Sequence, residues 1–259
     1  NCYCNFTIYF YSSLLILCSA EKNAFTFSIK AFAPTKEIFT EILKIGIPTL
    51  SFQLLTSLSI ALINRASNGY GDAVIAGMGA VTRITSMGTL AIFGFLKGFQ
   101  PIAGFSYGAK NFKRLRQSIK ISILWSTVFC IFAGLLMIIF SAQIISQFAN
   151  GNEEMLFIGQ KSLRANGFSF FLFGFYTVYS SLFLALGKGT AGFILGACRQ
   201  GICFIPVILL LPKILGINGI LYAQPVADVL SVIVTVFMAL DLHKKLSKEE
   251  SSLNLHKRY

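Results

Sequence analysis

The chain has 259 residues, of which 55% are hydrophobic and 12% are charged, and its mean hydropathy is +0.71. These values exclude an ordinary water-soluble domain, which carries about twice that share of charged residues. The net charge of +12 could serve nucleic-acid binding, but the basic residues cluster in alternate connections between apolar segments. That pattern indicates membrane topology, so we expect lipid as a partner and no nucleic acid.

Apolar segments long enough to cross a bilayer as helices, about 20 residues each, recur along the chain. Residues 1–20 begin with Asn1 and have no basic leader, so we expect the remnant of a preceding transmembrane helix. Residues 21–44 are amphipathic, and we expect a cytoplasmic connector. A six-helix transmembrane lobe is expected over residues 45–240. Its spans are predicted at 45–64, 73–96, 121–152, 165–187, 189–212 and 214–240.

The predicted fold is therefore all-α, a polytopic transmembrane helix bundle of six full spans plus the remnant of a preceding helix. Residues 241–259 are rich in basic side chains and show no apolar face, so we expect a solvated cytoplasmic tail. Basic residues also gather before the first full span and in the connection 97–120. We therefore expect a multi-pass protein of the cell (inner) membrane. By the positive-inside rule, both ends of this chain should lie in the cytoplasm.

Three ionisable residues lie deep inside predicted spans, namely Arg83, Arg199 and Asp228. Such residues are costly in lipid, so each should face protein or water. Asp228 could carry a cation or a proton, or it could be a structural counter-ion to Arg199 or Arg83. We favour the structural role, because a carboxylate paired with Arg is a poor proton carrier.

Polar residues follow helical spacing on three of the predicted spans and indicate faces suited to a hydrated cavity. Their hydroxyls could instead bond the carbonyls of their own helix. The candidate cavity residues are Gln53, Thr56, Thr82, Ser86, Tyr176 and Ser180. No catalytic constellation, cofactor motif or metal-ligand spacing accompanies them, and both His residues lie in the tail, so we expect no enzyme.

Four strings carry a family resemblance. They are KIGIPT at 44–49, GFQPIAGFSYGAKNFKR at 98–114, ACRQGICFIPVILLLP at 197–212 and GINGILYAQPVADVLS at 216–231. Together they resemble helices seven to twelve of the multidrug and toxin extrusion (MATE) family. The motif residues that the resemblance marks as structural are Pro48, Gly98, Gln100, Pro101, Gly108, Gln200, Pro206 and Pro225. We expect the four between 98 and 108 to shape a tight connection, because Pro101 should end the helix.

The resemblance implies a secondary active efflux transporter that exports amphiphilic, often cationic drugs or metabolites by alternating access. The coupling ion would be Na⁺ or H⁺, with no other cofactor, and an N-terminal lobe of the same transporter would complete the substrate site. Some Na⁺-coupled members have acidic residues in helices seven and ten, whereas this chain has Thr56 and Phe175 at about those places. An alternative is a lipid-linked oligosaccharide flippase, which a strongly basic cavity would favour. A non-transporting membrane scaffold is a third, which the lack of a hydrated face would favour.

Overall fold

The structure is a computed structural model that describes residues 35–149 and 151–256. Backbone contacts divide the chain into residues 1–44 and residues 45–259, and the packing below concerns the second unit. The predicted remnant 1–20 and most of the predicted connector 21–44 lie outside the described residues. Within the described ranges every element is a helix, which confirms the all-α class. The elements are α2 (Lys36–Asn68), α3 (Asp72–Gly108), α4 (Phe112–Ile139), α5 (Ser141–Ala149), α6 (Glu153–Ala185), α7 (Gly189–Ala197), η2 (Cys198–Ile202), α8 (Phe204–Leu215) and α9 (Ile217–His256).

Five helical segments of the described chain are long and apolar enough to cross a membrane. They are α3, α4, α6, the combined segment Gly189–Leu215, and Ile217–Ser251 of α9. The first predicted span, residues 45–64, is helical as part of α2 but is not among these five. The multi-pass character is thus confirmed, and the count of six spans stays a prediction.

The predicted span 121–152 is not one continuous helix. It begins earlier, with α4 at Phe112, and breaks at Phe140, after which α5 starts. At the break the hydroxyl of Ser141 donates to the carbonyl oxygen of Ile138 at 3.1 Å and accepts from Arg164 Nε at 2.9 Å. A side chain that bonds the backbone locally competes with helix continuation. The absence of charge over this stretch therefore did not reveal the break.

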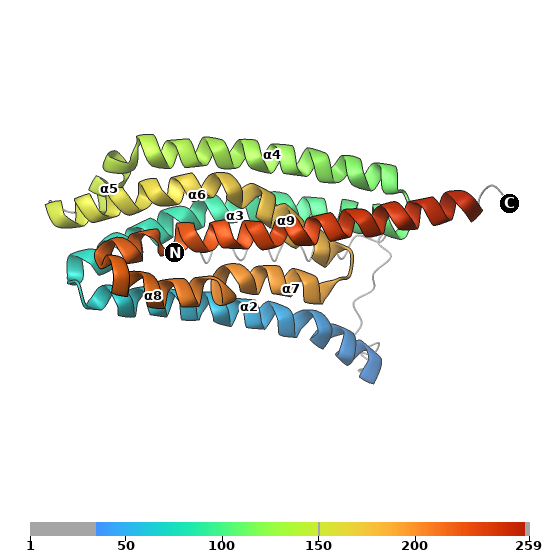
Figure 1. The fold of residues 1–259 in the computed structure, drawn as a ribbon, viewed down its shortest axis with the longest axis horizontal. Coiled ribbons are helices and arrows are strands. Elements are labelled where there is room, and N and C mark those ends of the chain that lie inside the picture. The colour runs from blue at the N-terminus through green and yellow to red at the C-terminus, as the bar shows by residue number, and fades with distance from the viewer. Residues whose placement is uncertain (1–34, 150, 257–259) are drawn as a thin grey trace, which may run out of the picture. The chain divides into compact units, whose positions relative to one another are not determined.

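Helix α6 lies at the centre of the bundle and packs against α3, α4, α5, α7 and α9 (Figure 1). Its approach to α4 depends on two glycines. A Cβ added to Gly134 would lie 2.6 Å from the carbonyl oxygen of Gly167, and one added to Gly167 would lie 2.9 Å from that of Gly134. Small residues permit such contact between membrane helices. The rings of Phe170 and Phe173 stack in the main core, with their centroids 5.2 Å apart.

The expected connection 97–120 is mostly helix, so this expectation is wrong. Helix α3 continues through Pro101 to Gly108, and Gly98, Gln100 and Pro101 all lie inside it. Basic residues mark the edge of a membrane rather than the end of a helix, and one proline removes one backbone donor without ending a well-packed helix. The turn falls at Lys110, which has φ 53°, and the side chain of Asn111 caps α4 by accepting from Arg114 N at 3.0 Å.

The other motif prolines also lie inside helices. Pro206 lies near the start of α8, directly after η2, and Pro225 lies inside α9. Pro48 lies within α2, but its side chain is outside the described residues.

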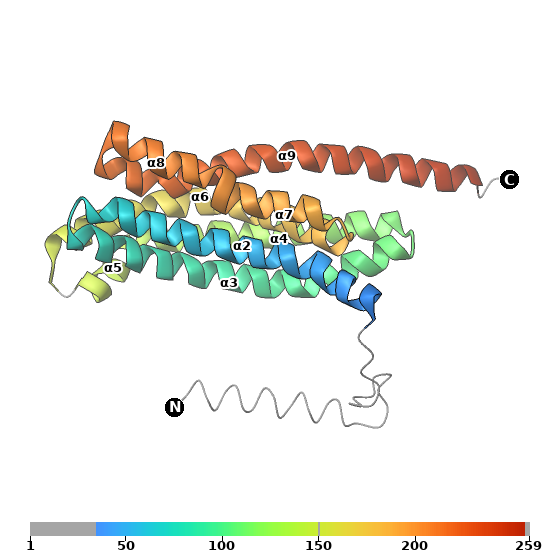
Figure 2. The same cartoon turned by 90° about the horizontal axis from the view of Figure 1, so that it is seen from below.

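The expectation of a solvated tail from residue 241 onward is also wrong, because α9 continues beyond residue 240 to His256 (Figure 2). Leu242 and Leu246 are buried in the main core. The ring of His243 lies 3.0 Å from the hydroxyl of Tyr179 through Nε2, and Arg116 at the start of α4 pairs with Glu250 at 2.9 Å. Two leucines spaced by four residues form the apolar face that inspection of the charged composition missed.

Candidate functional site: a polar cavity beside a buried ion pair

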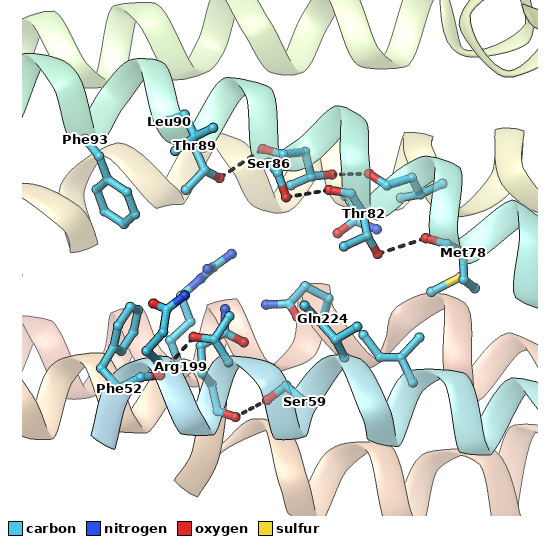
Figure 3. A pocket seen from close by; sticks show the side chains of 18 residues that line it. Phe52, Ser59, Met78, Thr82, Ser86, Thr89, Leu90, Phe93, Arg199 and Gln224 are labelled. Atoms are coloured by element: carbon cyan, nitrogen blue, oxygen red, sulfur yellow. Dashed lines mark hydrogen bonds between the residues drawn. The ribbon is translucent and has the colours of Figure 1, made fainter. Parts of the chain in front are cut away.

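A cavity of about 400 Å³ opens between α2, α3, η2 and the start of α9. In Figure 3, the α3 side chains from Met78 to Phe93 form one side, while Phe52 and Ser59 of α2, with Arg199 and Gln224, lie across from them. The lining of the cavity includes two aromatic rings, several hydroxyls and four side-chain amides. The lining residues are Phe52, Gln53, Thr56, Ser59, Ile60, Ile63, Met78, Val81, Thr82, Thr85, Ser86, Thr89, Leu90, Phe93, Asn166, Arg199, Gln200 and Gln224.

Four of the six predicted cavity residues line this space, namely Gln53, Thr56, Thr82 and Ser86. Their role in substrate binding remains a prediction. Tyr176 and Ser180 do not line the cavity. The hydroxyl of Tyr176 is buried and donates to the carbonyl oxygen of Leu195 at 3.2 Å, so α7 covers the α6 face that helical spacing marked as polar.

The sequence allowed the hydroxyls either to face a cavity or to bond carbonyls of their own helix, and the hydroxyls on the cavity side of α3, here called the α3 wall, do both. Each donates its proton to a carbonyl of its own helix, and each still faces the cavity. Thr82 bonds Met78 O at 2.8 Å, Ser86 bonds Thr82 O at 2.7 Å, and Thr85 and Thr89 do the same at 2.9 Å each. A hydroxyl has one proton and two lone pairs. With the proton engaged, this wall presents hydrogen-bond acceptors to the cavity.

A π-helix interrupts the span between α7 and α8. Over Cys198–Ile202 the backbone widens, and Cys203 N donates to Cys198 O at 2.9 Å. The hydroxyl of Ser59 on α2 reaches the carbonyl oxygen of Gln200 and holds the turn from the neighbouring helix. Single π turns inside α-helices are frequent at functional sites. Here the turn places Arg199 and Gln200 in the cavity wall.

Arg199 and Asp228 form a buried ion pair behind that wall. Arg199 Nε lies 2.8 Å from Asp228 Oδ1, and the two side chains are 10% and 6% exposed. Gln224 Nε2 donates to the same oxygen at 2.9 Å, and Ser169 Oγ lies 3.1 Å from Oδ2. The guanidinium carbon also sits 4.5 Å from the ring centroid of Phe173, a cation–π contact. Asp228 itself does not line the large cavity.

Arg83 is not the partner of Asp228. It is exposed on α3 and lies outside the cavity lining. Of the two counter-ions that the sequence allowed, the structure selects Arg199.

Sequence reasoning missed Asn166 and Gln224 and took Gln200 only as a structural motif residue. All three line the cavity. Gln224 precedes Asp228 by one helical turn, so its spacing was the available signal. Phe52 and Phe93 could not be separated from the other phenylalanines of the chain without knowing which faces meet. Among the described residues, no group of three or more His, Cys, Asp or Glu side chains could hold a metal ion.

These features define a polytopic helical membrane protein with a cavity between its helices that polar and apolar side chains line together. The MatE family model matches residues 48–210, and the chain belongs to that family.

The multidrug export protein MepA of Staphylococcus saprophyticus is 27% identical over 241 residues, which cover 90% of this chain and 51% of that protein. MepA of Staphylococcus haemolyticus is 26% identical over 240 residues, covering 92% of this chain and 52% of its own. The chain thus spans about half the length of these relatives. They are named as exporters, not as enzymes.

Two solved structures show the same fold. A crystal structure of MATE in complex with MaL6 has a TM-score of 0.82 at 20% identity and covers 92% of this chain and 55% of its own. An outward-facing multidrug resistance MATE transporter of the MOP superfamily has a TM-score of 0.79 at 21% identity, with coverages of 88% and 52%. The helix bundle described above superposes on about half of each of these longer chains.

Proposed function

We propose that this chain is the C-terminal lobe of a secondary active multidrug exporter in the cell membrane, with both ends of the lobe in the cytoplasm. Together with an N-terminal lobe it would export amphiphilic, often cationic compounds by alternating access, in exchange for Na⁺ or H⁺. The observation that carries the proposal is the cavity of about 400 Å³ between α2, α3, η2 and α9. Its mixture of rings, amides and hydroxyls suits small amphiphiles.

The cavity also bears on the charge of the substrate and on coupling. None of its lining residues is an aspartate or a glutamate, and Asp228 is enclosed by Arg199, Gln224 and Ser169. In this proposal a cation is held here by hydroxyl oxygens and by the faces of Phe52 and Phe93. The carboxylate that exchanges the coupling ion then belongs to the other lobe.

The flippase alternative receives less support from the same wall. Within the described residues, Arg199 is the one basic side chain that lines the cavity, and its charge is paired with Asp228. A lipid-linked oligosaccharide carries a diphosphate, which calls for several unpaired cations. A scaffold without transport would not need a polar interhelical cavity, so this alternative is also weaker.

The test is uptake of a fluorescent cationic dye into everted membrane vesicles that contain the transporter, driven by an imposed Na⁺ or pH gradient. We expect uptake to depend on one of the two gradients. Phe93→Ala should reduce uptake severalfold, because the Phe93 ring lines the cavity and lies 6.4 Å from that of Phe173. Phe105→Ala is the matched control, since this side chain of the same helix is 70% exposed and lies outside the cavity. Dye uptake that depends on neither gradient, or an equal loss of uptake in the Phe93→Ala and Phe105→Ala variants, would count against the proposal.

A further inference from the structure

Arg199 lies where the buried ion pair meets the cavity. Its Nε faces Asp228 Oδ1 at 2.8 Å and its Nη2 faces Oδ2 at 3.5 Å. A guanidinium carries five N–H donors, and within the described part of the chain no acceptor pairs with Nη1. Arg199 lines the cavity and Asp228 does not, so the guanidinium is the member of the pair that a ligand in the cavity can reach.

The guanidinium is also held in place from several sides. Asp228 fixes its edge, and the ring of Phe173 lies 4.5 Å from its central carbon. Asp228 is in turn fixed by Gln224 from one turn earlier on α9 and by Ser169 from α6. A donor held in this way loses little freedom when a ligand binds, which favours selectivity.

The two sides of the cavity offer different hydrogen-bonding groups. Across from Arg199, the hydroxyls of Thr82, Thr85, Ser86 and Thr89 have donated their protons to their own helix and offer acceptors. Arg199 offers charge-assisted donors on the opposite side (Figure 3). A ligand that fills the space meets donors at η2 and acceptors at α3.

We propose that Arg199 is a specificity-determining residue that binds a carboxylate or carbonyl oxygen of the substrate, and that Asp228 is the positioning residue that aims it. This inference rests on the proposed function, because it takes the cavity as the substrate site. It deepens that function by assigning one chemical group of the ligand to one side of the cavity. Ligands whose aromatic body carries such an acceptor bind more tightly than matched ligands in which the acceptor is weakened.

The experiment compares a cationic rhodamine that carries a carboxylate with its methyl ester, which has the same ring system. Binding to the purified transporter in detergent is measured by fluorescence anisotropy. A charge-assisted hydrogen bond gives an expected preference of about tenfold for the carboxylate. The double variant Arg199→Gln with Asp228→Asn keeps the charge balance and should bind both dyes equally. Arg83→Gln is the matched control, because it removes an exposed guanidinium of α3 outside the cavity lining, and it should keep the wild-type ratio.

The single variant Arg199→Lys gives a second reading that does not depend on the folding of the double variant. It keeps the charge opposite Asp228, but Lys has no second nitrogen to present to the ligand. We expect its carboxylate preference to fall severalfold. A wild-type protein that binds both dyes equally, or an Arg199→Lys variant that keeps the full preference, overturns the role of Arg199 and leaves the proposed function standing. Binding of neither dye, together with no gradient-driven uptake of either, sinks the proposed function and this inference with it.

Discussion

Replacement of Asp228 by Asn is the sharpest perturbation of this lobe. The substitution keeps the shape of the side chain and removes its charge. In the wild-type structure Asp228 Oδ1 accepts from Arg199 and Gln224, and Oδ2 lies near Arg199 and Ser169. An amide has only one acceptor oxygen, so its NH₂ group must face donors on one side. Arg199 would be left as a buried, uncompensated charge.

The burial of the ion pair sets the expected loss of folding free energy in Asp228→Asn. Breaking a buried ion pair by removing one partner costs about 3–5 kcal/mol, which lowers the folding equilibrium constant by roughly two to four powers of ten. The side chains of this pair are 10% and 6% exposed, so solvent screens them little. The pair Arg116–Glu250 is the matched contrast, because its side chains are 36% and 33% exposed. Glu250→Gln should therefore cost only about 0–1 kcal/mol.

The assay is the thermal unfolding midpoint and the folded yield of both variants in the same detergent, alongside dye uptake in vesicles. We expect Asp228→Asn to lower both midpoint and yield well beyond Glu250→Gln. The double variant with Arg199→Gln should recover much of the loss, because no buried charge remains. If Asp228→Asn folds as well as Glu250→Gln, the structural role is refuted. Normal folding and unchanged dye binding with abolished uptake would make Asp228 an ion carrier instead.

Three further predictions concern packing and topology. Gly134→Ala should lower folded yield strongly, because the added Cβ would lie 2.6 Å from a backbone oxygen, whereas Gly98→Ala meets nothing within 4 Å and should be tolerated. Leu246→Ala should cost about 2–5 kcal/mol of stability in unfolding experiments, since the side chain is 1% exposed, while Lys248→Ala on the exposed face should change stability by less than about 0.5 kcal/mol. A cysteine introduced by Lys113→Cys should resist an impermeant thiol reagent in intact cells and react in everted vesicles; the reverse pattern contradicts the cytoplasmic placement of this end.

The bundle was largely predictable because lipid imposes a simple rule on sequence. Long apolar runs are helical where they cross a bilayer, and the positions of α3, α6 and α9 follow from that rule, although α3 contains Arg83 and α9 contains Asp228. Helix ends were not predictable in the same way, because charge marks the membrane edge. Helix α3 passes Lys97 and Pro101 and ends at Gly108, and α9 passes residue 240 and ends at His256.

The lining of the cavity was predicted only in part. Helical spacing identifies the polar face of α2 and of α3, and Gln53 and Thr82 do line the cavity. It does not reveal which helix covers a face, so Tyr176 was assigned to the cavity although it bonds Leu195 of α7. The π turn at Cys198–Ile202 was not predicted either, and its residues contact Ser59 of α2 and Asp228 of α9, which lie far away in the sequence.

The measurement that tests the central claim most directly is ligand protection of a cysteine inside the cavity. Thr85→Cys, made after replacing the native cysteines, would place a thiol on the α3 wall. We expect a small water-soluble thiol reagent to label it in the purified transporter, and a cationic dye at saturating concentration to slow that labelling severalfold. Lys113→Cys, at the exposed start of α4, should react at the same rate with and without dye. Labelling of Thr85→Cys that the dye leaves unchanged, while the dye is bound, would contradict the assignment of this cavity as the substrate site.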